Sequence, residues 1–347
     1  MYHMPLPLTE FPTNMDPISQ GALGAVAAQS GAQSGRVGVA MLAGWLAGMA
    51  ADLDVLIRSS TDPLMFLEYH RHFTHSLIFI PVGGLIVALF VFWVFGRRRR
   101  WSFKHLLLYC TLGYATHGLL DSCTSYGTQL LWPFSDKRYA WDTISIIDPL
   151  FTLPVLGLLV LSLRKQSPWP ARAAIAWAIT YLCIGWWQNQ RALDVAAALA
   201  ESRGHQPVRL EVKPGFANLL LFKSIYSTGE RFYVDAVRVG ISSRWIEGNS
   251  VSKLVPTRDL PWLTKSSQQQ ADLQRFTWFS DGYVALHPDN PREVIDIRYS
   301  MLPNQIEPLW GIELDPNAKP SQFAKYRTHR DDPQSRVSEY WDMLRSR

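Results

Sequence analysis

Charged residues and cysteines are both scarce in this chain. Only 18% of its 347 residues are charged, and its three cysteines include no CxxC pair. Neither a disulfide framework nor a cysteine-type zinc site is therefore expected. Residues 1–16 contain neither a basic stretch nor an apolar stretch, so the sequence predicts no cleavable signal peptide.

The net charge of +5 is modest, and much of it comes from the run Arg97–Arg100 at the end of an apolar segment. A nucleic-acid-binding patch is one interpretation of such a run. A basic flank on a membrane-spanning segment explains its position better. We therefore expect membrane lipids as partners, and no nucleic acid.

Long segments with almost no charge fill the first half of the chain. They occupy residues 17–35, 37–51, 74–96, 105–120, 149–163 and 171–188. The third is long enough to cross about 30 Å of hydrocarbon, and the others are at or slightly below the usual ~20 residues. Residues 1–190 are thus predicted to form an α-helical polytopic membrane bundle of about six apolar helices.

Basic residues in the short loops predict how this bundle is oriented. They are Arg36 in one loop, Arg97–Arg100 with Lys104 in a second, and Arg164, Lys165 and Arg172 in a third. If these loops face the cytoplasm, as basic loops usually do, six spans alternate consistently. Both termini, and everything after about residue 190, then lie on the outer side.

The candidate metal ligands all fall at the ends of helices that meet this outer side. They are Asp52, Asp54, His70, His75, His117, Asp121, Asp142 and Asp148. Ionisable residues in or near a membrane span are costly and are therefore candidates for function. His117 and Asp121 are four residues apart and project from one helix face, either as ligands or as a mutually bonded pair.

The other clusters have competing explanations. Asp52 and Asp54 end a helix, where carboxylates oppose the macrodipole, so a cation explains them better than capping does. They could also be merely the first polar residues outside the bilayer. Thr74 is a predicted N-cap, which leaves His75 in the first helical turn and His70 in the preceding loop.

Asp148 precedes Pro149 and is explained by N-capping, with ligation as the alternative, while Asp142 stays open. Mixed His and Asp ligands suit Zn²⁺, Mn²⁺ or Fe²⁺, of which we take Zn²⁺ as the first choice. The sequence therefore predicts a divalent metal site built from several helix ends.

These residues resemble the YdjM-like family of membrane-bound metal-dependent hydrolases over residues 15–190. The matching motifs are "MDPISQGALGA" (15–25), "DLDVL" (52–56), "YHRHFTHSL" (69–77), "HGLLDSCTSYGTQLLWPFSD" (117–136) and "IIDPLFTLP" (146–154). The resemblance implies a polytopic protein of the bacterial inner membrane with a hydrolytic metal site. The ligands that it implies are Asp54, His70, His75, His117 and Asp121. Some members carry His where this chain has Gln20, so we do not count on a ligand from that helix.

From about residue 207 the pattern changes to the alternation of β-strands. Strands are predicted at VRLEV, ANLLLFKSIY, RFYVDAVRV, YVALH, EVIDIRY and LWGIEL, with a helix around Gln268–Phe276 in an otherwise polar segment 243–275. Residues 191–347 are therefore predicted to form a smaller, mainly antiparallel β soluble domain, facing the periplasm and ending in a polar tail. No catalytic cluster is visible there, because His205, His287 and His329 are isolated.

Three functions fit these features. The first is hydrolysis at the outer face of the inner membrane, with a phosphoester or lipid-linked substrate. Asp52 would then act as general base, and Arg71 would hold an anionic ester unless it serves only as an interfacial anchor. The second is a metal transporter or sensor. The third is a membrane scaffold with a structural metal and a partner-binding β domain. The sequence leaves the oligomeric state open.

Overall fold

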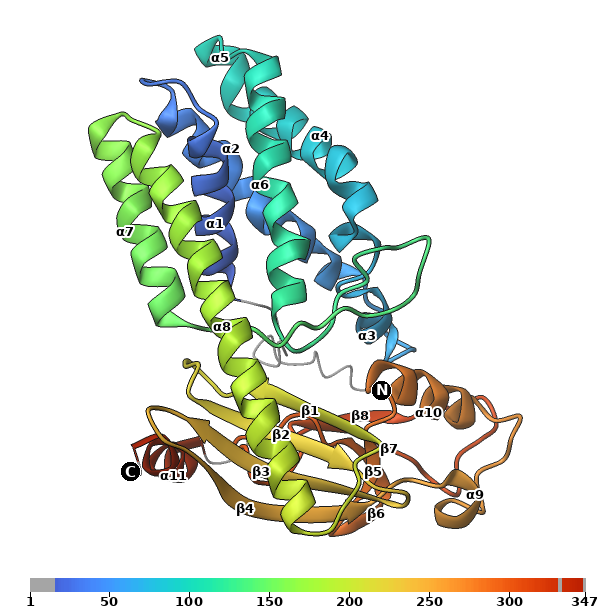
Figure 1. Cartoon of the computed structure of the whole chain (residues 1–347). Coiled ribbons are helices and arrows are strands. Elements are labelled where there is room, and N and C mark those ends of the chain that lie inside the picture. Colours follow the sequence, from blue (N-terminus) through green and yellow to red (C-terminus); the bar gives the residue numbers. More distant parts are fainter. Residues whose placement is uncertain (1–15, 330–332, 346–347) are drawn as a thin grey trace. The chain divides into compact units, whose positions relative to one another are not determined.

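The computed structural model describes residues 16–329 and 333–345 and divides into two compact units. One unit contains the chain up to Asp54 together with Arg71–Ile184, and the other contains Val55–His70 together with Gly185–Arg347. The first unit is helical, and the second carries all the β-sheets of the described chain (Figure 1). Residues 1–15, to which the signal-peptide prediction applies, lie outside the described residues.

The helical unit is built from apolar helices, as predicted. Its elements are α1 (Pro17–Ser30), α2 (Val37–Ala50), the 3₁₀ turns η1 (Ala51–Leu56), η2 (Phe73–His75) and η3 (Leu77–Phe79), α4 (Ile80–Val91), the π-helical η4 (Phe92–Gly96), α5 (Arg97–Arg99), α6 (Phe103–Cys123) and α7 (Pro149–Lys165). Helix α8 (Trp169–Ser202) begins in this unit and continues into the second.

The expectation of about six membrane spans is not met. Among the described residues, two helices are long and apolar enough to cross a bilayer, namely Val37–Leu56 and Leu77–Arg99. Helices α1 and α7 have 14 and 17 residues, fewer than the ~20 that a span needs. Helix α6 has 21 residues, but its ends carry Lys104, His105, His117 and Asp121, and α8 becomes polar from Gln188.

Glycines bring α1, α2 and α6 into unusually close contact. A Cβ atom on Gly24 would lie 2.5 Å from the carbonyl oxygen of Gly44, and one on Gly113 would lie 2.6 Å from the same oxygen. One turn further along α2, a Cβ on Gly48 would lie 2.6 Å from the Gln20 carbonyl oxygen. Small residues at such positions let membrane helices pack through their backbones. This packing sets Gln20 beside α2.

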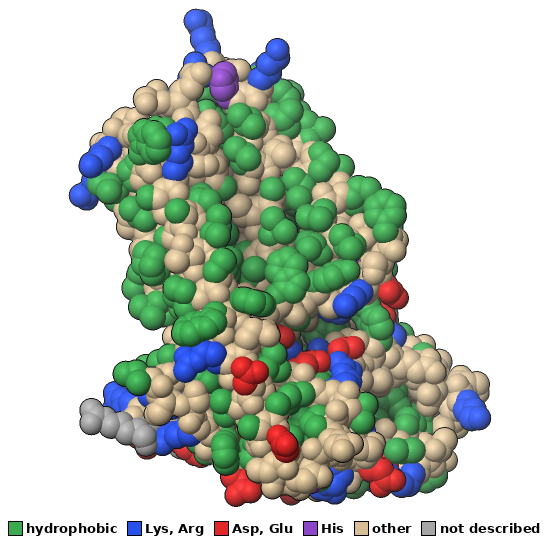
Figure 2. Space-filling view, in the orientation of Figure 1, with side chains coloured by type: hydrophobic (Ala, Val, Ile, Leu, Met, Phe, Trp, Pro, Cys, Tyr) green, Lys and Arg blue, Asp and Glu red, His purple; other side chains and the backbone are tan. Residues whose placement is uncertain are grey.

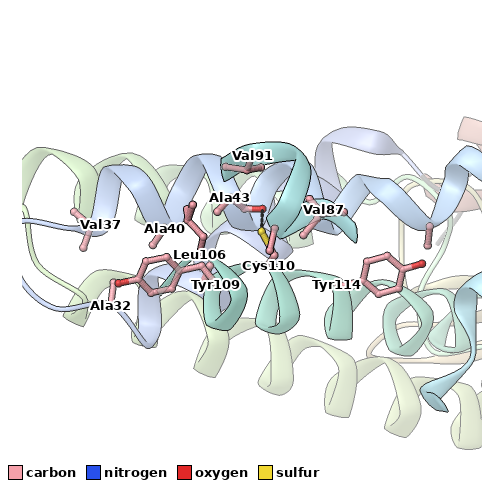
Figure 3. Packing of buried hydrophobic residues seen from close by; sticks show 14 residues of the cluster. Ala32, Val37, Ala40, Ala43, Val87, Val91, Leu106, Tyr109, Cys110 and Tyr114 are labelled. Atoms are coloured by element: carbon pink, nitrogen blue, oxygen red, sulfur yellow. Dashed lines mark hydrogen bonds between the residues drawn. The ribbon is translucent and has the colours of Figure 1, made fainter. Parts of the chain in front are cut away.

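A cluster of buried small, aliphatic and aromatic side chains packs within the helical unit (Figure 3). The buried cluster joins α2, α4 and α6 through Ala40, Ala43, Ala47, Val87, Val91, Leu106, Tyr109, Cys110 and Tyr114. The Cys110 thiol donates a hydrogen bond to the Ala43 carbonyl oxygen at 3.8 Å. Helix α6 is thus held between α1, α2 and α4, and this fixes the position of its C-terminal end.

Basic residues gather at one end of the helical unit. Arg172 donates a hydrogen bond to the Ser30 carbonyl oxygen at 3.1 Å, and the guanidinium of Arg36 lies 3.1 Å from the His105 ring. The run Arg97–Arg100 follows the second candidate span. Figure 2 shows Lys and Arg side chains, and no acidic ones, at the visible upper end of this unit. The three basic loops therefore belong to the same end.

The second unit contains two four-stranded antiparallel sheets, so an antiparallel β domain is confirmed. Their strand orders are β1-β2-β3-β4 and β5-β6-β7-β8. The strands are β1 (Arg209–Pro214), β2 (Leu221–Ser227), β3 (Arg231–Val239), β4 (Ser243–Ser252), β5 (Val284–His287), β6 (Asn290–Asp296), β7 (Trp310–Glu313) and β8 (Lys325–Thr328). The unit also holds α3 (Met65–Tyr69), α9 (Pro256–Asp259), α10 (Gln268–Phe279) and α11 (Pro333–Arg345).

Strand β4 and the elements β8 and α11 were not predicted from the sequence. Strand β4 reads SRWIEGNSVS and has no buried residue, so the apolar alternation that identifies a half-buried strand is missing. It forms because it lies at the edge of the sheet and pairs with β3. The predicted helix around Gln268–Phe276 is present as α10.

The first sheet is covered on both faces. On one face, Ala192 and Ala196 of α8 pack against a cluster that includes Phe222 and Val237. On the other face, Ile225 packs in a cluster with residues of the second sheet, and Leu221 and Ala236 pack in a cluster with Met343 of α11. The covered faces explain why every residue of β2 is buried.

Lys223 is an exception to the apolar interior of this domain. Its side chain is nearly buried, and its ammonium group donates hydrogen bonds to the Ser300 hydroxyl at 2.6 Å and the Gln305 carbonyl oxygen at 2.8 Å. Burial lowers the pKa of Lys223 to about 7, although the charge of Asp296 opposes this shift. Near neutral pH the folded domain therefore holds this group partly as the uncharged amine.

The substitution Gly44→Ala is expected to destabilise the helical unit. Its Cβ would meet the Gly24 carbonyl oxygen and would lie 2.5 Å from the Ala28 Cβ. Overpacking of this kind costs about 1–3 kcal/mol. The matched control Gly38→Ala, also in α2, would find its nearest neighbour at 3.5 Å and should be neutral. Thermal midpoints of the detergent-solubilised protein would test this, and equal midpoints would contradict the close packing.

The substitution Lys223→Met is expected to change how stability depends on pH. Between about pH 7 and 10.5 the unfolded chain keeps the proton of Lys223 while the folded chain loses it. The free energy of unfolding of the wild type therefore gains up to about 1.4 kcal/mol per pH unit from this group as pH rises. The thermal midpoint of the wild type should rise relative to that of the variant across this window, whereas parallel pH profiles would contradict the shift.

Candidate metal centre

Four acidic and imidazole side chains converge at one end of the helical unit. They are Asp52 from η1, His75 from η2, and His117 and Asp121 from α6, and together they could hold a metal ion. Helix α6 supplies two of them because residues four apart share a face. The turn η1 ends the first candidate span and η2 precedes the second, so both candidate spans contribute to the centre at the same end.

The distances between these side chains match the edges of a metal coordination shell. The Nε2 atoms of His75 and His117 are 3.0 Å apart. The Oδ1 atom of Asp52 lies 3.5 Å from His75 Nε2 and 3.3 Å from His117 Nε2. The Oδ2 atom of Asp121 lies 3.2 Å and 3.8 Å from the same two atoms. Ligands about 2.0–2.1 Å from a tetrahedral Zn²⁺ are about 3.3–3.4 Å from one another.

The other nitrogen of each imidazole ring faces a hydrogen-bond acceptor. His117 Nδ1 lies 2.5 Å from the Gly48 carbonyl oxygen, which can only accept. His75 Nδ1 lies 3.2 Å from Asp54 Oδ2 and 3.0 Å from the Thr74 hydroxyl. These partners assign the protons to Nδ1 and leave both Nε2 lone pairs pointing into the cluster. Two lone pairs and two carboxylates facing one another fit a divalent cation.

Asp121 is held from both sides. Its Oδ1 atom accepts a hydrogen bond from the Gln20 amide at 2.8 Å, and its Oδ2 atom lies 3.1 Å from Arg71 Nε. Arg71 is almost completely buried, donates to the Thr124 hydroxyl at 3.0 Å and lies over the Tyr126 ring. Its guanidinium faces the protein interior, where it neutralises part of the charge of Asp121.

Asp54 contacts the Nδ1 side of the His75 ring, away from the cluster. Its Oδ2 atom accepts hydrogen bonds from the Arg71 backbone N–H at 3.1 Å and from the Thr74 hydroxyl at 2.8 Å. The prediction that Thr74 is the N-cap of the following helix is therefore wrong. Helix α4 begins only at Ile80, after two 3₁₀ turns, and its N-cap residue makes no side-chain bond. The Thr74 hydroxyl instead orients the carboxylate that faces the His75 ring.

The remaining sequence candidates are not members of this group of four. His70 follows α3, belongs to the second unit and donates its backbone N–H to Phe66, and its role as a ligand stays a prediction. Asp148 is the N-cap of α7, as expected, because its Oδ1 atom accepts from the backbone N–H groups of Leu150 and Phe151. Asp148 and Asp142 belong to none of the candidate metal groups in the described part of the chain.

Two residues of the centre were missed by sequence reasoning. Gln20 was noted only as the position where some YdjM-like proteins carry His, yet its amide binds Asp121. Gly118 allows the closest approach in this region, because a Cβ there would overlap the His75 carbonyl oxygen. Its position next to His117, between two candidate ligands, was the sequence feature that could have indicated a close backbone contact at this site.

The four side chains of the centre differ in exposure. The side chains of His75, His117 and Asp121 are no more than 1% exposed, whereas that of Asp52 is 14% exposed. Asp52 is therefore the most accessible of the four.

Comparison with known proteins identifies the helical half. The family model described as YdjM inner membrane protein matches residues 15–192, just over half of the chain. The chain is 28% identical over 130 residues to the uncharacterized protein YfhP of Bacillus subtilis (strain 168), which covers 38% of each sequence. It is 34% identical over 113 residues to the inner membrane protein YbcI of Escherichia coli (strain K12), covering 30% of this chain and 61% of that protein.

Each alignment therefore spans less than two thirds of the relative's own length. No solved structure matches significantly. The chain belongs to the YdjM family of inner membrane proteins.

Proposed function

We propose that the protein is a membrane-bound, metal-dependent hydrolase that acts at the outer face of the inner membrane. The observation that carries the proposal is the convergence of Asp52, His75 and His117 with Asp121 at ligand-to-ligand distances of 3.0–3.8 Å. Such a cluster is costly at the end of a membrane helix unless a cation compensates it.

These four residues would hold the ion, with Zn²⁺ as the first choice and Mn²⁺ or Fe²⁺ as alternatives. A bound divalent ion lowers the pKa of its water toward neutrality and so supplies a hydrolytic nucleophile at physiological pH. Asp52 serves here as the most accessible ligand, and Asp54 orients His75 through its Nδ1 atom. The sequence suggests the opposite, with Asp54 as a ligand and Asp52 as the general base.

Arg71 acts as a positioning residue. Its burial and its ion pair with Asp121 support a role in fixing that carboxylate, and they leave no surface on which the guanidinium could hold an ester. A buried guanidinium beside a metal-binding carboxylate also keeps that carboxylate ionised.

The orientation of the centre follows from charge. The basic loops lie at the end of the helical unit where α6 begins, whereas His117 and Asp121 lie near the end of the same helix. By the positive-inside rule the basic end faces the cytoplasm, and the metal end faces outward. We place the β domain after α8 in the periplasm, with the apolar part of α8, up to Trp187, as a proposed crossing in addition to the two candidate spans.

The substrate is proposed to be a phosphoester or a lipid-linked molecule. A centre at the outer membrane surface whose most accessible side chain is Asp52 is within reach of headgroups. A cation held there would attract an anionic ester.

A membrane scaffold with a structural metal is the second candidate. Three of the four side chains are completely or almost completely buried, and closed four-ligand sites are typical of structural zinc. The two candidates differ in whether a coordination position beside Asp52 accepts an outside ligand.

Purified, detergent-solubilised protein is expected to contain about one equivalent of a divalent transition metal per chain, because its centre offers one set of four ligands. Elemental mass spectrometry should show that His75→Ala and His117→Ala each lose it. The control His105→Ala, at the opposite end of α6, should keep it. Well-folded wild type without metal would contradict both candidates.

The metal-loaded protein is then expected to cleave chromogenic phosphoesters, to stop on chelation, and to recover when the metal is restored. Two results together would favour the scaffold. The protein would retain its metal but hydrolyse no phosphoester or lipid-linked phosphate. The visible absorption spectrum of the Co²⁺-substituted protein would also stay unchanged when phosphate is added.

Gly118→Ala is expected to weaken metal binding without removing a ligand. The new Cβ would push against the His75 backbone and displace its ring from the cluster. Loss of such supporting geometry typically costs roughly 10- to 100-fold in metal affinity. Gly157→Ala on α7 is the matched control, because its Cβ would find no atom within 4 Å. Competition titration with a fluorescent chelator would measure both, and equal affinities would argue against the role of this contact.

A further inference from the structure

The turns of the first β-sheet fall at two ends that differ in polarity. Strands β1 to β4 are consecutive and antiparallel, so the β1–β2 turn (215–220) and the β3–β4 turn (240–242) lie at the same end. The β2–β3 turn (228–230) lies at the opposite end. The first two turns carry Phe216, Leu220 and Ile241, whereas the third consists of Thr, Gly and Glu.

The apolar side chains at the first end are exposed. Phe216 is 63% exposed, Leu220 is 39% exposed, and Ile241 has no cover at all. Three such side chains on adjacent turns form an apolar patch, and patches of this kind mark interaction surfaces.

Both apolar turns are fastened to α8. The Gln188 amide donates hydrogen bonds to the carbonyl oxygens of Leu219 at 2.9 Å and Val239 at 3.1 Å, and Arg191 donates to the Gly240 carbonyl oxygen at 2.6 Å. The turns therefore surround α8 at residues 188–191, next to the exposed Trp186 and Trp187.

Tryptophan pairs of this kind are typical of the boundary between a membrane and water. Arg191 lies 4.9 Å from the Trp187 ring, so the pair also has a cationic neighbour suited to lipid phosphate. From Trp169 to Trp187 the helix rises about 27 Å, close to the ~30 Å of a hydrocarbon core. The apolar turns thus lie at the depth where α8 would leave the bilayer.

We propose that Trp187, Phe216, Leu220 and Ile241 form an apolar collar that inserts into the outer leaflet of the membrane that α8 crosses. Lipid is the expected partner of the collar because the turns that carry these side chains are bonded to α8 where that helix would leave the membrane. Apolar side chains at this boundary are buried by roughly 5–10 Å. The inference rests on the membrane crossing by α8 proposed above and is independent of hydrolysis.

The test uses the full-length protein in phosphatidylethanolamine–phosphatidylglycerol vesicles that contain a phosphatidylcholine with a nitroxide near its headgroup. A nitrobenzoxadiazole probe is attached at Ile241→Cys, at Phe216→Cys, or at Gly229→Cys in the polar turn, each in a Cys183→Ser background. Cys110 and Cys123 are buried and should not react. Cys183 of the wild type is exposed on α8 and carries the probe that reports the crossing itself.

The nitroxide lipid is expected to quench the probes at positions 241 and 216 roughly twofold, with no quenching at 229, since an interfacial depth of about 5–10 Å brings them to the nitroxide. Quenching at Cys183 without quenching at 241 and 216 would overturn the collar and leave the crossing intact. No quenching at Cys183 would overturn the crossing and the collar together.

Discussion

The candidate metal centre brings together imidazole and carboxylate groups whose mutual repulsion the chain relieves only in part, through Arg71. Two imidazole Nε2 atoms lie 3.0 Å apart, and two carboxylates approach the same point. The Gly48 carbonyl and Asp54 engage the other nitrogens, so no ring proton is left for the centre of the cluster. A cation bound at the centre would compensate the remaining charge of this cluster. Two buried residues hold Asp121 in place: Gln20 donates to its Oδ1 atom, and Arg71 pairs with its Oδ2 atom, which also faces His75.

Close backbone packing makes this convergence possible. The ligands come from segments far apart in sequence, and their side chains are too short to bridge a wide gap between helices. Gly44 and Gly48 let α1 approach α2, and Gly118 lets α6 approach the backbone of His75. The contact that brings in α1 also delivers Gln20 to Asp121. Helix packing and metal geometry are therefore linked, because moving α6 away from its neighbours by the width of a methyl group would lengthen the distances from His117 and Asp121 to Asp52 and His75.

The sequence predicted the parts of the site that local rules determine. His117 and Asp121 follow from helical spacing, and His75 from its place before a long apolar run. The relation between Asp52 and Asp54 could not be predicted, because it depends on a 3₁₀ turn that continues α2. The burial of Arg71 was equally hidden, since its left-handed backbone (φ 62°) and its ion pair are tertiary features. The number of spans was overestimated because apolar composition was counted where helix length fell short. Strand β4 was not predicted because it forms by pairing at the edge of the sheet and its sequence lacks apolar alternation.

Asp52 differs from the other three proposed ligands in its exposure to solvent. A closed structural site would gain from burying all four ligands equally, since exposure brings competing water. Here the three ligands on α6 and η2 are sealed, and the one on η1 is not. Helix α2 and η1 together form the first candidate span, so Asp52, the most exposed of the four side chains, lies in the last turns of that span. If this segment crosses the membrane, a metal bound there would lie near the headgroup layer. This asymmetry is the physical reason to prefer chemistry on a surface-borne substrate over a purely structural metal.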